Sequence, residues 1–231
     1  MLEQITYNHN GTPLTGWLAR PQGAPRGAVL VFPTIANVTP AIERRAAMLA
    51  DAGFIALIAD FYGEQPAGFE ASFPLANELR ADAGHYRARL AASVATLAQL
   101  AEGLPMAAVG YCMGGQAVLE LAREGTPLVA AVSFHGVFET LRPASADKPF
   151  KGRVLICHGD ADPLAPREAV LGLWQELDAA GIAWDFHAYS GVKHGFTDPG
   201  SDARGMPALG YDAAADRASW SAMMTLFDEV F

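Results

Sequence analysis

Short apolar runs constrain the fold of this chain more than any other feature of its sequence. Five such runs, each four to seven residues long, occur without regular polar alternation, a pattern typical of strands that are covered on both faces. Strands of this kind occur in parallel sheets that carry helices on both sides. The runs are residues 27–32, 54–59, 106–109, 128–134 and 154–157.

Helical periodicity and a hairpin complete the pattern. Residues 3–7 and 14–20 predict two antiparallel strands joined by a turn at Asn10 and Gly11, and residues 184–189 alternate like a strand near a sheet edge. Helices are expected over residues 40–52, 81–102, 116–123, 167–180 and 211–230. We therefore predict an α/β fold, with a mostly parallel sheet of about eight strands and helices on both faces.

One stretch, residues 63–78, lacks clear periodicity. It is rich in Gly, Pro and aromatic residues, and a loop of this length in a compact domain often covers or binds a ligand. We therefore expect a loop over these residues, with a role as a lid or a binding loop.

Composition and charge narrow the classes of function. With 231 residues, of which 51% are hydrophobic and 18% charged, the chain is expected to form one globular domain over residues 1–231. A net charge of −9 argues against a nucleic-acid partner, and no apolar run reaches the length of a membrane span. Two cysteines and the absence of a recognisable export signal predict a cytoplasmic protein without a disulfide framework or a cysteine-based zinc site. One of them, Cys157, lies within a buried run and is expected in the core.

A cysteine flanked by glycines lies between an expected strand and an expected helix. The sequence Gly110-Tyr111-Cys112-Met113-Gly114 has the G-x-C-x-G spacing of a nucleophile elbow, with cysteine in place of the usual serine. Such a turn holds the nucleophile in a strained backbone conformation, and the flanking glycines keep side chains out of it. The N-terminus of the following helix would lower the pKa of the thiol from its free value of about 8.5. A buried, inert cysteine is the alternative interpretation of the motif alone.

Candidate partners for Cys112 follow other strands. Asp160 and Asp162 come after the run at 154–157, and His194 comes after the edge strand. Ligands bind beyond the carboxyl ends of parallel strands, so these side chains are expected close to the thiol. A histidine can move the proton and a carboxylate can orient the imidazole; the order nucleophile, acid, histidine is that of the α/β-hydrolases. We predict a triad of Cys112, Asp162 and His194.

Each partner has a competitor. Asp160 competes with Asp162, which we favour because Pro163 restricts its turn and can fix the carboxylate outward. His135 and His158 also follow strands, and a structural role is the expectation for both.

The oxyanion hole is expected to use two backbone N–H groups. One belongs to Met113, directly after the nucleophile, and the other to Ile35, in the loop after the third strand. Residues at the same edge of the sheet are candidates to line the substrate pocket: Thr34, Tyr62 and His135.

Taken together, these motifs resemble the dienelactone hydrolase (carboxymethylenebutenolidase) family of the α/β-hydrolase superfamily. The similarity covers nearly the whole chain, and its main segments are residues 110–115, 133–136, 158–163, 194–196 and 213–220. The resemblance implies a hydrolase whose triad is Cys112, Asp162 and His194.

Two positions depart from the best-studied type of this family. That type has a glutamate that takes part in activating the cysteine where this chain has Thr34, and an arginine that binds the substrate carboxylate where this chain has Asp198. A negative charge at Asp198 would repel a lactone that bears a carboxylate. These departures argue against a dienelactone as the substrate.

The function predicted from the sequence is hydrolysis of a small ester, lactone or thioester through a thioester acyl-enzyme on Cys112. The alternatives are a catalytically idle protein of the same fold, which binds a small ligand or a partner protein, and an acyltransferase. Because water completes the cycle, neither a metal nor an organic cofactor is expected. The protein is expected to be a monomer or a homodimer without a nucleic-acid or membrane partner.

Overall fold

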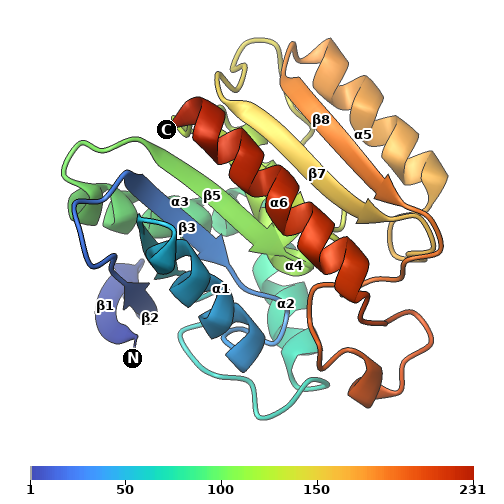
Figure 1. Ribbon diagram of the computed structural model, residues 1–231, viewed down its shortest axis with the longest axis horizontal. Helices are drawn as coiled ribbons and strands as arrows, with labels where there is room; N and C mark the ends of the chain where they lie inside the picture. Colours follow the sequence, from blue (N-terminus) through green and yellow to red (C-terminus); the bar gives the residue numbers. More distant parts are fainter. Residues whose placement is uncertain (1) are drawn as a thin grey trace. The chain divides into compact units, whose positions relative to one another are not determined.

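The computed structural model describes residues 2–231, and its strands and helices follow the order expected from the sequence (Figure 1). The eight strands in this part of the chain form one sheet in the order β1-β2-β4-β3-β5-β6-β7-β8. Contacts within the chain divide it into two compact units, residues 1–108 and 109–231. The single domain expected from the sequence stays a prediction.

The first unit begins with the expected hairpin. β1 and β2 are antiparallel, with Glu3 opposite Leu18 and His9 opposite Thr12, so β1 forms one edge of the sheet. β2 then pairs antiparallel with β4, and β4 pairs parallel with β3. The elements of this unit are β1 (Glu3–His9), β2 (Thr12–Ala19), β3 (Gly27–Phe32), α1 (Pro40–Asp51), β4 (Phe54–Ile58), α2 (Ser72–Arg80) and α3 (Ala83–Ala101).

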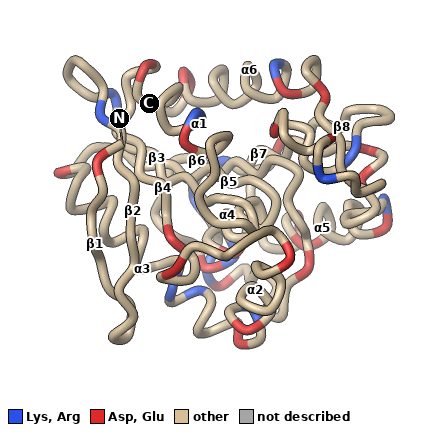
Figure 2. Tube along the Cα trace, turned by 90° about the horizontal axis from the view of Figure 1, so that it is seen from below, with Lys and Arg blue, Asp and Glu red and all other residues tan. Residues whose placement is uncertain are grey.

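Two capped helices cover the strands of the first unit. Every residue of β3 and β4 is buried, as the continuous apolar runs predict. α1 starts where the Thr39 side chain accepts from the backbone N–H of Ile42, and α3 starts where Asp82 accepts from that of His85. α1 and α3 lie on opposite faces of β3 and β4 (Figure 2).

The second unit continues with parallel strands. β6 pairs with β7 and β7 with β8, each in parallel, so β8 forms the other edge of the sheet. Within this unit α6 lies on one face of the strands, whereas α4 and α5 lie on the other (Figure 2). Its elements are α4 (Met113–Arg123), β6 (Ala130–Phe134), β7 (Arg153–Gly159), α5 (Arg167–Ala179), β8 (Ala183–Tyr189), the short 3-10 helix η1 (Asp202–Arg204) and α6 (Ala213–Val230), while β5 (Met106–Tyr111) crosses the boundary between the units.

The structure corrects three expectations about the elements. The stretch 63–78, expected to be a loop, contains the start of α2, a nine-residue helix without a side-chain N-cap whose buried residues are too few to produce a clear period. α4 begins at Met113, three residues earlier than expected, because two glycines in its first turn weaken the helical pattern. β7 extends to Gly159, so His158 lies within the strand and not after it.

The length and apolar character of the helices show whether any of them could span a membrane. Among the described residues, none of the helices combines the length and the apolar character that a membrane span needs.

Candidate active site

The turn at Cys112 has the strained geometry expected of a nucleophile elbow. Cys112 directly follows β5 and precedes the first residue of α4, with φ 58° and ψ −117°, a conformation that costs a residue with a Cβ about 1–3 kcal/mol. Its side chain is partly exposed. α4 begins directly after Cys112, so its first turn, with unpaired backbone N–H groups and the positive end of the helix dipole, adjoins the nucleophile residue.

Glycine at position 110 is required by the close approach of the chain to itself. A Cβ added to Gly110 would lie 1.9 Å from the carbonyl oxygen of Gly114 and 2.2 Å from its carbonyl carbon. Both contacts are to backbone atoms, which cannot rotate away. The flanking glycine thus keeps a side chain out of the turn, as the motif predicts.

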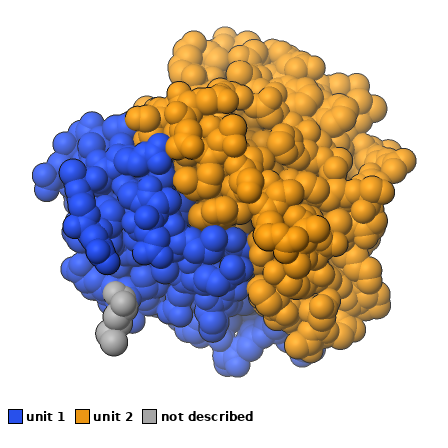
Figure 3. All heavy atoms as spheres, viewed as in Figure 1, with its two compact units in different colours: residues 1–108 blue, residues 109–231 orange. Residues whose placement is uncertain are grey.

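Asp162 and His194 form a buried hydrogen-bonded pair in the same unit as Cys112, residues 109–231, which is coloured orange in Figure 3. The Nδ1 of His194 lies 2.7 Å from Oδ2 of Asp162, and each residue is only 2% exposed. The other oxygen of Asp162, Oδ1, accepts from the backbone N–H of Leu164 at 2.8 Å, which fixes the carboxylate. With Nδ1 facing the carboxylate, the imidazole turns its Nε2 away from Asp162.

The charge state of His194 depends on Cys112. Burial alone would lower the pKa of His194, but the charge of Cys112 and the hydrogen bond that His194 donates to Asp162 raise it from 6.5 to about 10. Nε2 is buried and makes no well-aligned hydrogen bond with any described residue, although the Cys112 side chain is close enough to act on the ring. This arrangement favours an imidazolium beside the sulfur.

The backbone of His194 is held on both sides. Its N–H donates to the carbonyl of Ala208 at 3.1 Å, and its carbonyl accepts from Gly210 at 3.1 Å. The next residue, Gly195, has φ 71°, and a Cβ there would lie 2.8 Å from Oγ of Ser201. These contacts fix the position of the loop after β8, which carries His194.

The competing acid and the second cysteine have other partners. Asp160 forms a two-point ion pair with Arg167, at 2.9 and 2.7 Å, near the surface. Cys157 is fully buried in β7, and burial raises the pKa of its thiol to about 12, so it stays protonated at neutral pH. The structure therefore brings Asp162, and not Asp160, to His194.

His135 and His158, the two competing histidines, are both buried in the second unit. His158 is 2% exposed and lies between the rings of Phe138 and Phe186, each with its centroid 5.6 Å away. Burial lowers the pKa of His158, against the raising effect of Asp162. His135 is 1% exposed, and its ring contacts the backbone of Cys112, which places it beneath the nucleophile turn.

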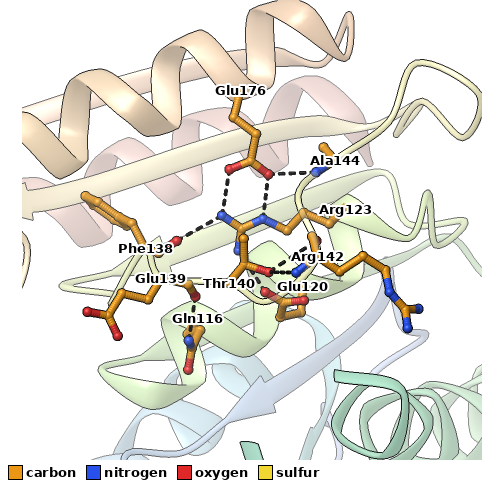
Figure 4. A network of polar contacts seen from close by, with 9 residues as sticks. All are labelled: Gln116, Glu120, Arg123, Phe138, Glu139, Thr140, Arg142, Ala144 and Glu176. Atoms are coloured by element: carbon orange, nitrogen blue, oxygen red, sulfur yellow. Dashed lines mark hydrogen bonds and ion pairs between the residues drawn. The ribbon is translucent and has the colours of Figure 1, made fainter. Parts of the chain in front are cut away.

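A buried ion cluster anchors the far end of α4 (Figure 4). The guanidinium of Arg123 bonds to Glu120 at 2.9 Å, to both oxygens of Glu176 at 2.7 and 2.9 Å, and to the carbonyl of Phe138 at 3.0 Å. Burial would lower the pKa of Arg123, but its bonds to the two carboxylates raise it, so the cluster stays ionised. Glu176 also accepts from the backbone N–H of Ala144, which ties the segment between β6 and β7 to α5.

The acidic residue after the histidine is neutralised by a neighbour. Asp198 pairs with Arg204 at 2.9 Å and accepts from the backbone N–H of Gly200. From the sequence, the negative charge of Asp198 is expected to repel a substrate carboxylate. Because Arg204 offsets that charge, the repulsion is weaker than expected.

The predicted residues of the first unit lie in two loops that are bonded to each other. Tyr62 donates its hydroxyl to the carbonyl of Ile35 at 2.9 Å, and Asn37 links to Asp60 at 2.9 Å. The hydroxyl of Thr34 accepts from the backbone two residues later, at 3.3 Å. These contacts fix the shape of the loop that carries the Ile35 amide, whereas its role as an oxyanion donor and the pocket roles of Thr34 and Tyr62 stay predictions.

Sequence reasoning missed several of these partners. Thr197, which bonds to the ring of His135, lies in the loop after β8, and Arg204, which pairs with Asp198, is the last residue of the short helix η1. A three-residue helix and a loop leave no periodic pattern in the sequence, so only the closeness of both residues to the His194 motif in the chain could have indicated them.

Comparison with known proteins gives consistent relatives. The chain is similar to the solved structure of m3DLH, with 36% identity and a TM-score of 0.92 over 100% of this chain and 98% of that one. It is also similar to P91, a dienelactone hydrolase-like promiscuous phosphotriesterase from metagenomic libraries, with 34% identity and a TM-score of 0.90 over the same shares. Among curated proteins, a probable 2-oxo-3-(5-oxofuran-2-ylidene)propanoate lactonase of Bradyrhizobium sp is 26% identical over 95% of this chain and 91% of its own length.

The family assignment rests on most of the chain. The α/β-hydrolase fold expected from the sequence is confirmed by the strand order and by these structural neighbours. The sequence model described as the dienelactone hydrolase family matches residues 14–231, which include the strained turn, the acid and the histidine. The chain therefore belongs to the dienelactone hydrolase family, a family of hydrolases.

Proposed function

We propose that this chain hydrolyses a small carboxylic ester, lactone or thioester, with Cys112 as nucleophile, His194 as proton carrier and Asp162 as the group that orients His194. The observation that carries the proposal is the buried His194, bonded to Asp162 through Nδ1 and influenced by Cys112. The strained φ of Cys112 supports it, because such strain persists where the surrounding structure enforces it for function.

In the proposed reaction the thiolate of Cys112 attacks the carbonyl carbon of the substrate. The bond from that carbon to the leaving group breaks, and the leaving alkoxide or thiolate takes a proton from Nε2 of His194, leaving a thioester on Cys112. His194 then accepts a proton from water, which attacks the thioester and releases the acid and the thiolate. The cycle uses only residues of the chain, the substrate and water.

The oxyanion that forms in both steps needs hydrogen-bond donors. We propose the backbone N–H of Met113, in the first turn of α4, together with that of Ile35. Asp162 holds the imidazole in the tautomer that leaves Nε2 toward the reaction and stabilises the ring when it is charged.

The relatives suggest which substrates to test. The probable lactonase of Bradyrhizobium supports lactones, and P91 supports an activated phosphotriester as a secondary substrate. Since Arg204 offsets the charge of Asp198, we include both a neutral lactone and one that bears a carboxylate.

The test is a panel of nitrophenyl esters, lactones, acyl thioesters and one phosphotriester, assayed with the wild type and with Cys112→Ala. We expect Cys112→Ala to lose at least about a thousandfold in kcat/KM on every carboxylic substrate that the wild type cleaves, with an unchanged thermal unfolding midpoint. Unchanged turnover in this variant would sink the assignment, and a folded wild type without any Cys112-dependent turnover would support an idle binding protein. Analysis of the products with added alcohol or amine acceptors separates hydrolysis from acyl transfer.

We also propose a cellular location and an oligomeric state. Neither Cys112 nor Cys157 forms a disulfide in the described part of the chain, which supports a reducing, cytoplasmic environment. A monomer or a homodimer is the proposed state, which light scattering on the purified protein would test.

A further inference from the structure

Two residues of the second unit share an unusual backbone conformation. Among the described residues of that unit, the non-glycine residues with positive φ are Cys112, at 58°, and His135, at 39°. Each conformation costs about 1–3 kcal/mol and persists only where surrounding contacts enforce it. They lie 23 positions apart in the chain, after two different strands.

A hydrogen bond joins the two strained residues directly. The backbone N–H of Cys112 donates to Nδ1 of His135 at 3.1 Å and also to the carbonyl of Phe134 at 3.1 Å. The backbone N–H of His135 donates to the carbonyl of Cys157 at 2.8 Å, which fixes its position against β7. The imidazole of His135 therefore holds the peptide group on which the thiol depends for its direction.

The contacts of His135 define its protonation state. Because Nδ1 accepts from Cys112, it carries no proton, and the neutral ring carries its proton on Nε2. Nε2 lies 2.9 Å from Oγ1 of Thr197, so it donates to that hydroxyl. With both nitrogens engaged in a residue that is 1% exposed, His135 is arranged to hold neighbours and not to shuttle protons.

The second partner of His135 belongs to the segment that carries the base. Thr197 follows His194 by three residues, and the ring of His135 meets the rings of His194 and Phe196 edge to face, with centroids 5.1 and 5.2 Å apart. The imidazole of His135 thus connects the backbone of the nucleophile turn with the loop of the histidine base.

The surroundings leave this connection little room to shift. A Cβ on Gly115, in the first turn of α4, would lie 2.6 Å from Cα of Gly136, and one on Gly136 would lie 2.2 Å from Oγ of Ser133. The backbone of Gly136, directly after His135, therefore packs against the backbone of Gly115. A change in its side chain cannot be absorbed by a small movement of the turn.

We infer that His135 is a positioning residue, whose neutral ring holds the backbone of Cys112 and the Thr197 loop so that the thiol and the imidazole of His194 stay aligned. This inference rests on the proposed function, since it assigns the alignment to the nucleophile and the base of that reaction. Misplacement of reacting groups by about 1 Å costs up to about 100-fold in rate.

The test compares two replacements that differ in one property. Both Asn and Gly tolerate a positive φ, but only Asn offers a short side-chain acceptor to the N–H of Cys112. On a nitrophenyl ester we expect His135→Gly to lower kcat by about 10- to 100-fold with KM changed by less than about threefold, and His135→Asn to stay within about fivefold of the wild type. Equal rates in the two folded variants would overturn the inference.

A second pair of variants tests the other end of the ring without altering the strained residue. Thr197→Val removes the acceptor for Nε2 of His135, whereas Thr197→Ser keeps a hydroxyl. We expect kcat to fall by about three- to tenfold in Thr197→Val and to be restored in Thr197→Ser. If Thr197→Val keeps the wild-type kcat, the coupling to the base segment is wrong, and this holds even if His135→Gly fails to fold.

Alkylation of Cys112 separates this inference from the proposed function. The rate of its modification by iodoacetamide at one pH, followed by peptide mass mapping to exclude Cys157, reports alignment of the thiol with His194 without any substrate. A lower rate in His135→Gly, restored in His135→Asn, supports the positioning role even if no ester is cleaved. If ester cleavage persists in Cys112→Ala, the proposed function fails; equal alkylation rates in wild type and His135→Gly contradict the positioning role alone.

Discussion

The second unit contains two buried polar clusters, around Arg123 and around His194, that satisfy their groups differently. The guanidinium of Arg123 meets two carboxylates and a backbone carbonyl, so its charge is fully compensated. His194 has one compensated nitrogen, Nδ1, which faces Asp162, while Nε2 has no well-aligned partner among the described residues.

This difference separates a structural cluster from a reactive one. A fully paired buried cluster stabilises the position of its elements, and removal of one member leaves an uncompensated charge. A buried imidazole that meets a carboxylate on one side and a thiol on the other remains available for proton transfer. Burial is common to both clusters, so the cysteine beside the imidazole, in place of a second carboxylate, is the feature that indicates chemistry.

The largest expected effect concerns the structural cluster. Arg123→Ala leaves Glu120 and Glu176 buried without their partner, so we expect the free energy of unfolding to fall by about 3–5 kcal/mol. Urea denaturation followed by circular dichroism measures this. The matched control is Arg153→Ala, since Arg153 pairs with Asp185 and Glu229 but is 39% exposed; it should cost at most about 1 kcal/mol. Equal losses in the two variants would show that burial of the Arg123 cluster adds nothing.

The next effect concerns the pH dependence of the reactive cluster. The pKa of His194 is raised to about 10, so the imidazolium needed to protonate the leaving group is lost as the pH rises through about 10, and kcat/KM should fall there. Asp162→Asn removes a negative charge that raises this pKa, so the alkaline limb should move to lower pH and kcat/KM at pH 8 should drop by about 10- to 100-fold.

A neighbouring carboxylate supplies the control for this profile. Asp160 precedes Asp162 by two residues in the chain and pairs with Arg167. Asp160→Asn removes its charge and should leave the alkaline limb of the pH–kcat/KM profile at the wild-type pH. An alkaline limb at the same pH in the wild type and in Asp162→Asn would contradict the assignment of Asp162.

The same raised pKa has a consequence for stability. Because the pKa of His194 in the folded protein exceeds its ordinary value of 6.5, the protonated ring stabilises the fold. That contribution is complete below about pH 6.5 and is lost as the pH rises through about 10. The free energy of unfolding measured across this window should therefore fall, and it should fall less in Asp162→Asn.

The smallest effect concerns the histidine that sequence reasoning treated as a competitor. His158 lies between two phenylalanine rings and burial lowers its pKa, so it is neutral at pH 7. We expect His158→Phe to keep kcat/KM within about threefold of the wild type and to change the unfolding free energy by less than about 1.5 kcal/mol. If folded His158→Phe lost a hundredfold or more in kcat/KM, His158 would have to take part in the reaction.

Most of the fold could be predicted because its strands are defined by local pattern. Residues 27–32 form a strand with the predicted bounds, since a continuous apolar run has one stable place, inside a covered sheet. The helix at Ser72–Arg80 was missed because few of its residues are buried and its start has no capping side chain. Its position depends on packing that no local pattern records.

The candidate site also has a part that the sequence predicts and a part that it does not. The positions of Cys112, Asp162 and His194 could be predicted, because each follows a strand and parallel strands bring such positions to one edge. The bond from Cys112 to His135 and the pairing of Asp198 with Arg204 could not, since they depend on the path of irregular loops. For Asp198 this changed the conclusion, because its charge is offset by a partner that the sequence does not reveal.

The pH dependence of Cys112 alkylation by iodoacetamide, resolved by peptide mass mapping, tests the central claim most directly. If Cys112 and His194 form an activated pair, the apparent pKa of the thiol lies clearly below the free value of about 8.5, and it returns toward that value in His194→Ala. An apparent pKa near 8.5 in the wild type, unchanged in His194→Ala, would contradict the account.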